Sequence, residues 1–444
     1  MPSQIFLQRN GSQLERFGKR VRGFMFNWYG LIQENYTTAQ LDTYFSRLAD
    51  LGVIGVRTWA FNKSGTPSNT AGYFRYRSGS TLPFVEATYV SLDRVLDSAR
   101  RHGIVVFLVL SDNWTEFSST GHKQTYTAWS NAIHGTAYDA FNKGDDFYLD
   151  ANIIQWKKDE IDKLYNRTNT VDGITYPSHP GIGALEMINE GRFTTGEEQN
   201  YGQLTSYFYT TVKTWMNTMS TYAAGKFPNH LIGTGSQAQF IDYYENDPVH
   251  NNSTYGNDYT DIHKLTNIHF YDFHMYPLED ATDYRLKAYG QKILSNINSG
   301  RTRRGFLAQI NEYVSVAKAN NKPVIIGELG IDKRANVATV FPTYPRVDFF
   351  RDFANYFFSI GGDIINIWHG TTSIFDDNNY NVLVSGTHTG GNANSNDNDN
   401  DASLLQLIAD ITSSFNRKRN QKTPTKITPT LVSSARSQIT RTQL

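Results

Sequence analysis

Two glutamates lie at the ends of short apolar segments that predict buried strands. Glu190 ends GALEMINE (residues 183–190), and Glu328 lies near the end of KPVIIGELG (residues 322–330). Two carboxyl groups that converge on one site can divide the work of proton donor and nucleophile, or of acid and base. The chain must therefore place two distant strand ends next to each other if these glutamates are to react together.

The tripeptide Ile-Asn-Glu occurs twice, at residues 188–190 and 310–312. The first copy ends a predicted strand, whereas the second lies in the middle of a predicted helix over residues 302–321. Catalytic groups of α/β barrels lie at the C-terminal ends of the strands. We therefore expect chemistry at Glu190 and an ordinary exposed side chain at Glu312.

Polar and aromatic residues close the other predicted strands in the same way. Arg57 and Trp59 follow the apolar segment 53–56, and Trp114 follows the segment 104–110. His274 and Tyr276 lie near the end of the segment 267–277, and Trp368 lies near the end of the segment 363–370. Two carboxylates accompanied by basic and aromatic side chains at equivalent heights form a specific constellation, and the aromatic rings can stack on flat, apolar ligand faces.

These residues need a scaffold that brings strand ends together, and the segment pattern predicts one. Eight apolar, strand-like segments alternate with helix-like segments: 21–30, 53–61, 104–114, 183–190, 230–236, 267–277, 322–330 and 363–370. Such alternation indicates parallel strands with right-handed crossovers, and eight units predict a closed (β/α)8 TIM barrel. A doubly wound open sheet is the alternative, but the glycine-rich loop expected after its first strand is absent from the sequence.

The charge balance, the lack of cysteine and the absence of long apolar runs argue against several classes of protein. The chain has 444 residues with 42 basic and 42 acidic side chains and no cysteine. Zero net charge argues against a nucleic-acid partner, and the lack of cysteine excludes disulfides and thiolate metal sites. No apolar run is long enough to cross a membrane. The first twenty residues lack the apolar core of a signal peptide, so we expect either no export by that route or a leader already removed.

The C-terminal part differs in composition from the rest of the chain. We predict one catalytic domain over residues 1–420 and a flexible Thr/Ser-rich tail over residues 421–444. Residues 386–401 read as a polar, low-complexity loop. Alternating Asp397, Asp399 and Asp401 suggest a calcium loop, but the glycine and distal glutamate that such a loop needs are missing, so we favour a solvated loop.

Several segments together resemble glycoside hydrolase family 5, and within it most closely the endo-β-1,4-mannanases. The matching segments run in the family's order through roughly residues 20 to 370: VIGVRTWAF, LSDNWTEF, residues 145–192, FYDFHMYP, KPVIIGELG and INIW. The resemblance implies a retaining glycoside hydrolase that needs no metal or cofactor. It also implies a monomer that acts on polysaccharide outside the cell.

The resemblance implies a role for each matching residue. Glu190 would be the general acid/base and Glu328 the nucleophile. Asn189 would hold the substrate 2-hydroxyl, Arg57 and Tyr276 would hydrogen-bond the nucleophile, and His274 would orient the acid/base region. The remaining positions would contact sugar rings: Trp368 as the platform at the reacting subsite, Trp59 at a strand end, and Trp114 and Arg192 on either side.

Two expectations follow that the structure can test. Arg57 should keep Glu328 ionised, whereas Glu190, without such a partner, should be protonated near neutral pH. The chain also departs from the family pattern, because Gly191 replaces a usual proline and GTGSQAQF (residues 233–240) lacks a usual Glu-Gly pair. These changes leave open hydrolysis of another β-glycan, and a non-catalytic carbohydrate-binding or structural protein is a further alternative.

Overall fold

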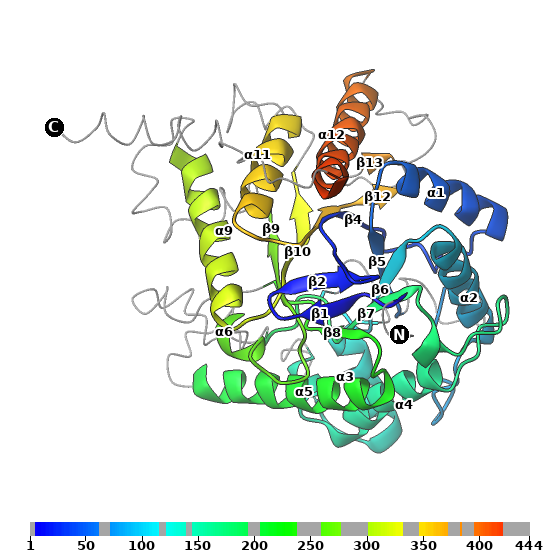
Figure 1. Ribbon diagram of the computed structural model, residues 1–444. Coiled ribbons are helices and arrows are strands. Elements are labelled where there is room, and N and C mark those ends of the chain that lie inside the picture. The colour runs from blue at the N-terminus through cyan, green and yellow to red at the C-terminus, as the bar shows by residue number, and fades with distance from the viewer. Residues whose placement is uncertain are drawn as a thin grey trace.

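The computed structural model describes residues 5–61, 72–114, 121–138, 144–193, 205–237, 259–276, 301–331, 346–371, 382–383 and 395–420. Eight parallel strands form its central sheet, and helices surround them (Figure 1). The strands are β4 (Gly23–Asn27), β5 (Gly55–Trp59), β6 (Val105–Val109), β7 (Ile182–Glu186), β8 (Leu231–Gly233), β9 (Tyr271–Met275), β10 (Val324–Gly330) and β11 (Ile364–Trp368). Seven of them lie within a segment that the sequence predicts as a strand, and β7 begins one residue before its predicted segment at 183.

The sheet curves round into a nearly closed barrel. Its first strand, β4, pairs with its last, β11, and the spatial order follows the chain on either side of that pair. The two remaining edges, β8 and β9, approach each other where the His269 amide donates to the Ile232 carbonyl at 2.8 Å. The predicted (β/α)8 barrel is therefore confirmed, and the doubly wound sheet is excluded because its first and last strands would not pair.

Side chains fill the barrel in layers. Near the N-terminal ends of the strands the interior is apolar, with Met25, Phe107 and Ile325 among its members. A small antiparallel sheet of β1 (Gln8–Asn10), β2 (Gln13–Arg16) and β3 (Lys19–Arg20) adds Leu7 and Leu14 to this layer and lies across that end of the barrel (Figure 1). Alternation along each strand then turns polar side chains inward at the opposite end.

The helices pack their apolar faces on the outside of the barrel. They are α1 (Thr38–Asp50), α2 (Glu86–Arg101), α3 (Lys123–His134), α4 (Ala151–Tyr165), α5 (Thr205–Lys226), α6 (Tyr259–Ile262), α9 (Arg301–Ala319), α11 (Arg346–Ser359) and α12 (Ser395–Asn420). In α1, Thr37 and Gln40 form a capping box, and the buried residues Leu41, Phe45 and Leu48 recur at helical spacing. None of the helices in these ranges is long and apolar enough to cross a membrane.

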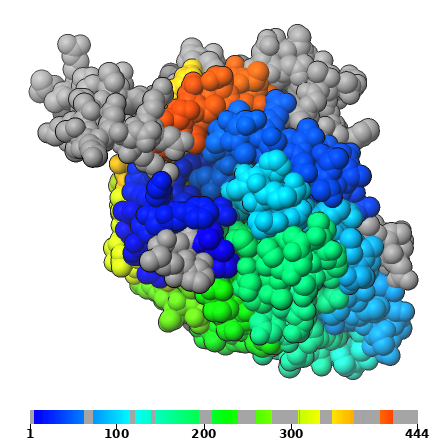
Figure 2. Space-filling view, turned by 45° about the vertical axis from the view of Figure 1, so that its right-hand side comes forward, coloured from blue at the N-terminus to red at the C-terminus, as the bar shows by residue number. Residues whose placement is uncertain are grey.

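The last helix completes the ring between α11 and α1. Figure 1 places α12, in orange, between α11 and α1, and Figure 2 shows its orange surface directly beside the blue N-terminal part of the chain. Thr412 of α12 faces Gly52, where an added Cβ would come within 2.5 Å of the threonine methyl group. The close approach of α12 at this point therefore depends on a glycine after α1.

The structure corrects the C-terminal prediction in part. Residues 395–401, expected in a polar loop, form the start of α12, and Asp401 is buried with its carboxylate 3.4 Å from Arg346. An ion pair therefore accounts for this aspartate without calcium. Residues 386–394 and the predicted tail at 421–444 lie outside the described residues, and the single-domain boundary at 420 stays a prediction.

Candidate active site

Arg57 organises the polar end of the barrel interior. It projects inward from β5, is fully buried, and its Nε lies 2.7 Å from Glu186 Oε2. Its Nη1 lies 2.8 Å from Glu328 Oε1 and 3.0 Å from Asn27 Oδ1. A guanidinium suits this position because its fixed fork of donors reaches several acceptors at once. Glu186 is thus the buried structural carboxylate that its position within the strand predicts.

Glu328 projects from β10 and is held by donors on both oxygens. Arg57 donates to Oε1, and the Tyr276 hydroxyl donates to Oε2. Burial raises the pKa of Glu328 above its usual value, while the charges of His274 and Arg57 and the Tyr276 hydrogen bond oppose that rise. A carboxylate fits this donor set better than a carboxylic acid, which would need an acceptor for its proton.

Glu190 lies four residues beyond the end of β7, with a left-handed backbone at φ +49°. For a residue with a side chain this conformation costs about 1–2 kcal/mol. Two neighbouring strand ends hold it in place. The Glu190 amide donates to the Gly235 carbonyl at 2.7 Å, and the Asn189 amide donates to the Ser111 carbonyl at 2.8 Å. The backbone strain therefore coincides with the proposed acid/base.

The carboxyl group of Glu190 also has two partners. His274 Nδ1 lies 2.5 Å from Oε1, and Trp114 Nε1 donates to Oε2 at 2.5 Å. Burial alone would raise the pKa of Glu190, but the His274 hydrogen bond and charge, followed by Trp114 and Arg192, lower that pKa to about 2. The expectation of a partnerless, protonated Glu190 is therefore wrong for the free protein, because donors reach it from β9 and from the segment after β6.

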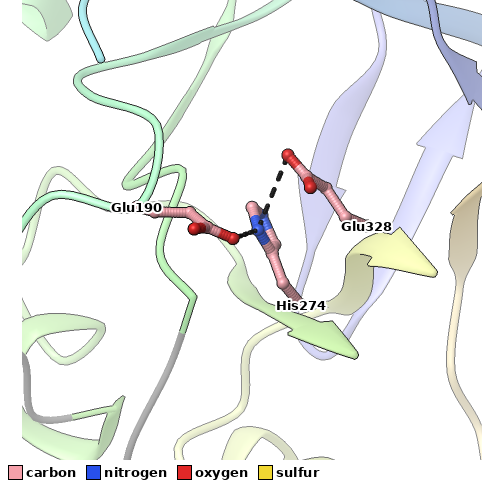
Figure 3. A group of neighbouring side chains, drawn as sticks. All are labelled: Glu190, His274 and Glu328. Carbon is pink, nitrogen blue, oxygen red and sulfur yellow. Dashed lines mark hydrogen bonds and ion pairs between the residues drawn. The ribbon is translucent and has the colours of Figure 1, made fainter. Parts of the chain in front are cut away.

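His274 joins the two glutamates. Figure 3 shows its imidazole between the carboxyl groups, with Nδ1 at 2.5 Å from Glu190 and 3.6 Å from Glu328. Burial lowers the pKa of His274, but Glu328 and Glu190 together raise it above the usual value. The charges of the three groups therefore influence one another's pKa values. A metal between them would need bonds of about 2.0–2.2 Å and would have to separate the His274–Glu190 pair.

The two carboxyl groups are close enough for a direct attack on a sugar carbon. One carboxylate oxygen of Glu190, one of Glu328 and a nitrogen of His274 all lie within 4.8 Å of one another. Retaining glycosidases separate their carboxyl groups by about 5–5.5 Å, and inverting enzymes by about 6.5–9.5 Å to admit a water molecule. The geometry falls in the retaining class.

Asn189 presents a fixed amide beside these carboxyl groups. Arg57 Nη2 donates to its Oδ1 at 2.9 Å, and its Nδ2 donates to Asp112 Oδ1 at 3.1 Å. The amide orientation is therefore set from both sides. The amide nitrogen Nδ2 has two hydrogens. One is used in the bond to Asp112, and the other can donate a hydrogen bond to a substrate hydroxyl.

The raised pKa of Asp112 makes the stability of the protein depend on pH. Burial raises the pKa of Asp112 to about 7, partly opposed by hydrogen bonds from Asn189 and the Trp114 amide. Since the folded pKa lies above the unfolded one, ionisation of Asp112 removes stability as pH rises from about 4 to about 7. Asp112→Asn should therefore exceed the wild type in unfolding free energy by about 1–3 kcal/mol at pH 8 and match it near pH 4, as measured by urea denaturation.

Asp93→Asn is the matched control for that measurement. Asp93 is equally buried, on α2, but Arg167, Thr170 and Tyr176 hold its pKa below the usual value against burial. Its loss should destabilise the protein increasingly as pH rises, the opposite trend. A pH-independent difference between Asp112→Asn and the wild type would contradict the raised pKa.

Aromatic rings pack together at the C-terminal ends of β5 and β11. Trp368, at the end of β11, stacks on Tyr29 at 5.8 Å between ring centroids and packs against Trp59 at 5.9 Å. Trp59 in turn stacks on Phe61 and lies under the Arg57 guanidinium. The ring of Trp59 thus packs against both Trp368 and the Arg57 guanidinium.

Arg192 lies on the other side of Glu190. Its guanidinium packs over the Trp114 ring at 4.6 Å, and its Nη1 donates to Gln237 Oε1 at 3.0 Å. The buried Lys123 donates to the Arg192 carbonyl and pairs with Asp145. Trp114 and His274 donate to the two oxygens of Glu190, and the charge of Arg192 lowers the pKa of Glu190 further.

All ten predicted site residues lie at the C-terminal end of the barrel, and direct contacts link them. The twin tripeptide does not take part: Asn311 is exposed and Glu312 half-buried on α9. Sequence reasoning missed the contributions of Asn27, Asp112 and Asp272. All three follow or occupy inward-facing positions of β4, β6 or β9. The alternation of inward and outward side chains along these strands would have indicated that they face the site.

Comparisons with known proteins agree with this geometry. The sequence model of a family described as GH family 5 beta-mannosidase-like matches residues 4–364. Mannan endo-1,4-beta-mannosidase 3 of Arabidopsis thaliana is 28% identical over 341 residues, which is 74% of this chain and 72% of that protein.

Solved structures share the fold. An endo-1,4-beta-mannanase from Rhizomucor miehei superposes with a TM-score of 0.69 at 22% identity, covering 92% of this chain and 99% of that chain. The endo-1,4-beta-D-mannanase from Thermotoga petrophila gives a TM-score of 0.63 at 21% identity, covering 88% and 99% respectively. With the family match extending over most of the barrel, the chain belongs to glycoside hydrolase family 5, in the group described as β-mannosidase-like.

Proposed function

We propose that this protein is an endo-acting β-1,4-mannanase that cleaves mannan, glucomannan or galactomannan with retention of configuration. The observation that carries the proposal is the pair of carboxyl groups, Glu190 after β7 and Glu328 on β10, with oxygens within 4.8 Å. The relatives named as mannan endo-1,4-beta-mannosidases support the substrate class.

In the first step Glu328 acts as the nucleophile. One oxygen attacks the anomeric carbon while the bond to the leaving oxygen breaks, which forms a covalent glycosyl-enzyme. Arg57 and Tyr276 hold the attacking carboxylate in place and keep both its oxygens supplied with donors. Since the transition state resembles an oxocarbenium ion, the ionised form of Glu328 also stabilises its positive charge.

Glu190 must supply a proton to the leaving oxygen in the same step. In the free protein the lowered pKa of Glu190 and the raised pKa of His274 place the proton of the pair on His274 Nδ1, 2.5 Å from Glu190 Oε1. Transfer along this hydrogen bond converts Glu190 to the acid form when substrate occupies the site. In the second step Glu190 takes a proton from water, which attacks the anomeric carbon and releases Glu328.

Asn189 and Trp368 fit the sugar at the reacting subsite. The oriented amide of Asn189 can donate to the 2-hydroxyl, a contact that strengthens in the transition state. Trp368, backed by Tyr29 and Trp59, offers an indole face to the apolar side of the ring.

Product analysis tests the proposal. Purified protein is incubated with ivory-nut mannan, glucomannan, barley β-glucan and soluble cellulose, with Glu190→Gln as the blank. We expect mannan and glucomannan to yield a mixture of short oligosaccharides. Release of mannose alone would indicate exo-action, cleavage of glucan without mannan would indicate another β-glycan, and no cleavage of any of them would indicate a non-catalytic protein.

A further inference from the structure

The segment that follows β8 touches the proposed acid/base at several points. The Gly235 carbonyl accepts the Glu190 amide at 2.7 Å, and the Thr234 carbonyl accepts the Ile188 amide at 3.2 Å. Gly235 itself has φ +77°, and an added Cβ would come within 2.4 Å of the Ile188 carbonyl oxygen. The left-handed backbone of Glu190 therefore depends on where residues 234–236 lie.

Asp272 fixes that segment from the neighbouring strand. Its Oδ2 accepts the Gly235 amide at 2.8 Å and the Ser236 amide at 3.0 Å. Its Oδ1 accepts the Thr234 hydroxyl at 2.5 Å. Three consecutive residues are thus tied to one fully buried carboxylate on β9.

A histidine supports the carboxylate on its outer side. His263 Nε2 lies 2.5 Å from Asp272 Oδ1, and its Nδ1 lies 2.8 Å from the Tyr259 carbonyl. Burial would raise the pKa of Asp272, but the hydrogen bond and charge of His263, then Thr234, lower it, which keeps the group a carboxylate. Both oxygens of Asp272 are occupied by protein donors, so its action on substrate is indirect.

Asp272 also sits two residues before His274 on the same strand. His274 reaches the Glu190 side chain, while Asp272 reaches the Glu190 backbone through Gly235. We propose that Asp272 is a positioning residue for the acid/base: through residues 234–236 it sets the backbone of Glu190 and so the place from which the proton is delivered. This inference rests on the proposed role of Glu190.

Substrates with different leaving groups separate such a role from a merely structural one. A phenyl glycoside needs a proton on its leaving oxygen, whereas a 2,4-dinitrophenyl glycoside departs as a stable anion without one. The ratio kcat/KM reports steps up to and including the first bond cleavage. Misplacing the proton donor should therefore lower kcat/KM for the phenyl substrate alone.

The experiment measures kcat/KM for phenyl and 2,4-dinitrophenyl β-mannobioside in four proteins: wild type, Asp272→Asn, Glu190→Gln and the buried-acid control Asp93→Asn. For Asp272→Asn we expect a loss of about 10- to 100-fold on the phenyl substrate and less than about threefold on the other. Asp93→Asn should leave the ratio between the two substrates unchanged. Thr234→Val, which removes one hydrogen bond from Asp272, should shift the ratio in the same direction by a few-fold and serves if Asp272→Asn does not fold.

Two results would overturn the inference in different ways. If Glu190→Gln is selectively slow on the phenyl substrate but Asp272→Asn and Thr234→Val slow both substrates equally, Asp272 does not position the acid. If Glu190→Gln itself shows no dependence on the leaving group, Glu190 is not the acid, and the proposed function fails together with the role of Asp272.

Discussion

Glu328→Ala is expected to lower kcat on mannan by about four orders of magnitude or more, because no other carboxylate among the described residues is placed to form the glycosyl-enzyme. The fold should survive the change, since Arg57 keeps Glu186 as a partner at 2.7 Å. Initial rates of reducing-sugar release measure the loss, and thermal unfolding checks that the variant is folded.

Anion rescue shows whether the lost group was the nucleophile. In Glu328→Ala, azide can enter the space below the ring and attack an aryl β-mannobioside, giving the α-glycosyl azide. Glu312→Ala is the control, because this glutamate lies on α9 away from the site, and we expect its rate to stay within about twofold of the wild type. Full activity of Glu328→Ala would remove Glu328 from the mechanism.

Arg57→Lys is expected to cost about 3–5 kcal/mol of unfolding free energy, because buried acceptors lose hydrogen bonds, and at least about 100-fold in kcat. An ammonium group cannot reproduce the four contacts of Arg57 with Glu186, Glu328, Asn27 and Asn189. The buried carboxylates would keep a positive charge nearby but lose hydrogen bonds to it, so the nucleophile and the Asn189 amide would both lose their orientation. Urea denaturation and steady-state kinetics measure the two effects.

Arg20→Lys provides the comparison for that substitution. Arg20 also pairs with a buried carboxylate, Asp363 at 2.8 Å, but its side chain is 27% exposed and lies at the opposite end of the barrel. We expect a loss of less than about 1.5 kcal/mol and an unchanged kcat. Equal effects of the two substitutions would show that Arg57 contributes only a charge.

Much of the fold and the main site residues follow from local sequence patterns. The apolar segments around Phe107 and Ile325 and the helical spacing of Leu41, Phe45 and Leu48 each reflect burial that a strand or helix imposes on its own residues. Glu190 and Glu328 could be located because strand ends and catalytic groups coincide in this architecture.

The finer features depend on contacts between segments distant in the chain. The left-handed backbone of Glu190 arises from hydrogen bonding to Gly235, and nothing in residues 183–192 encodes that partner. The lowered pKa of Glu190 depends on Trp114 and His274, which approach it from two other segments. Its environment could therefore not be predicted from the neighbouring residues alone.

The glycine at position 191, where the family usually has a proline, fits the backbone conformation of Glu190. A residue before proline is pushed toward extended conformations, so a proline at 191 would oppose the left-handed backbone of Glu190. A Cβ on residue 191 would also come within 2.4 Å of the Ile188 side chain. Glycine is therefore the residue that this arrangement of the acid/base accommodates.

The anomeric configuration of the first product tests the central claim most directly. Proton NMR is recorded during the first minutes of mannohexaose hydrolysis, before the released sugar equilibrates between its anomers. Carboxyl oxygens within 4.8 Å predict that the β-anomer appears first and the α-anomer only later, by mutarotation. Initial release of the α-anomer would mean that water attacks directly, and would contradict Glu328 as the nucleophile.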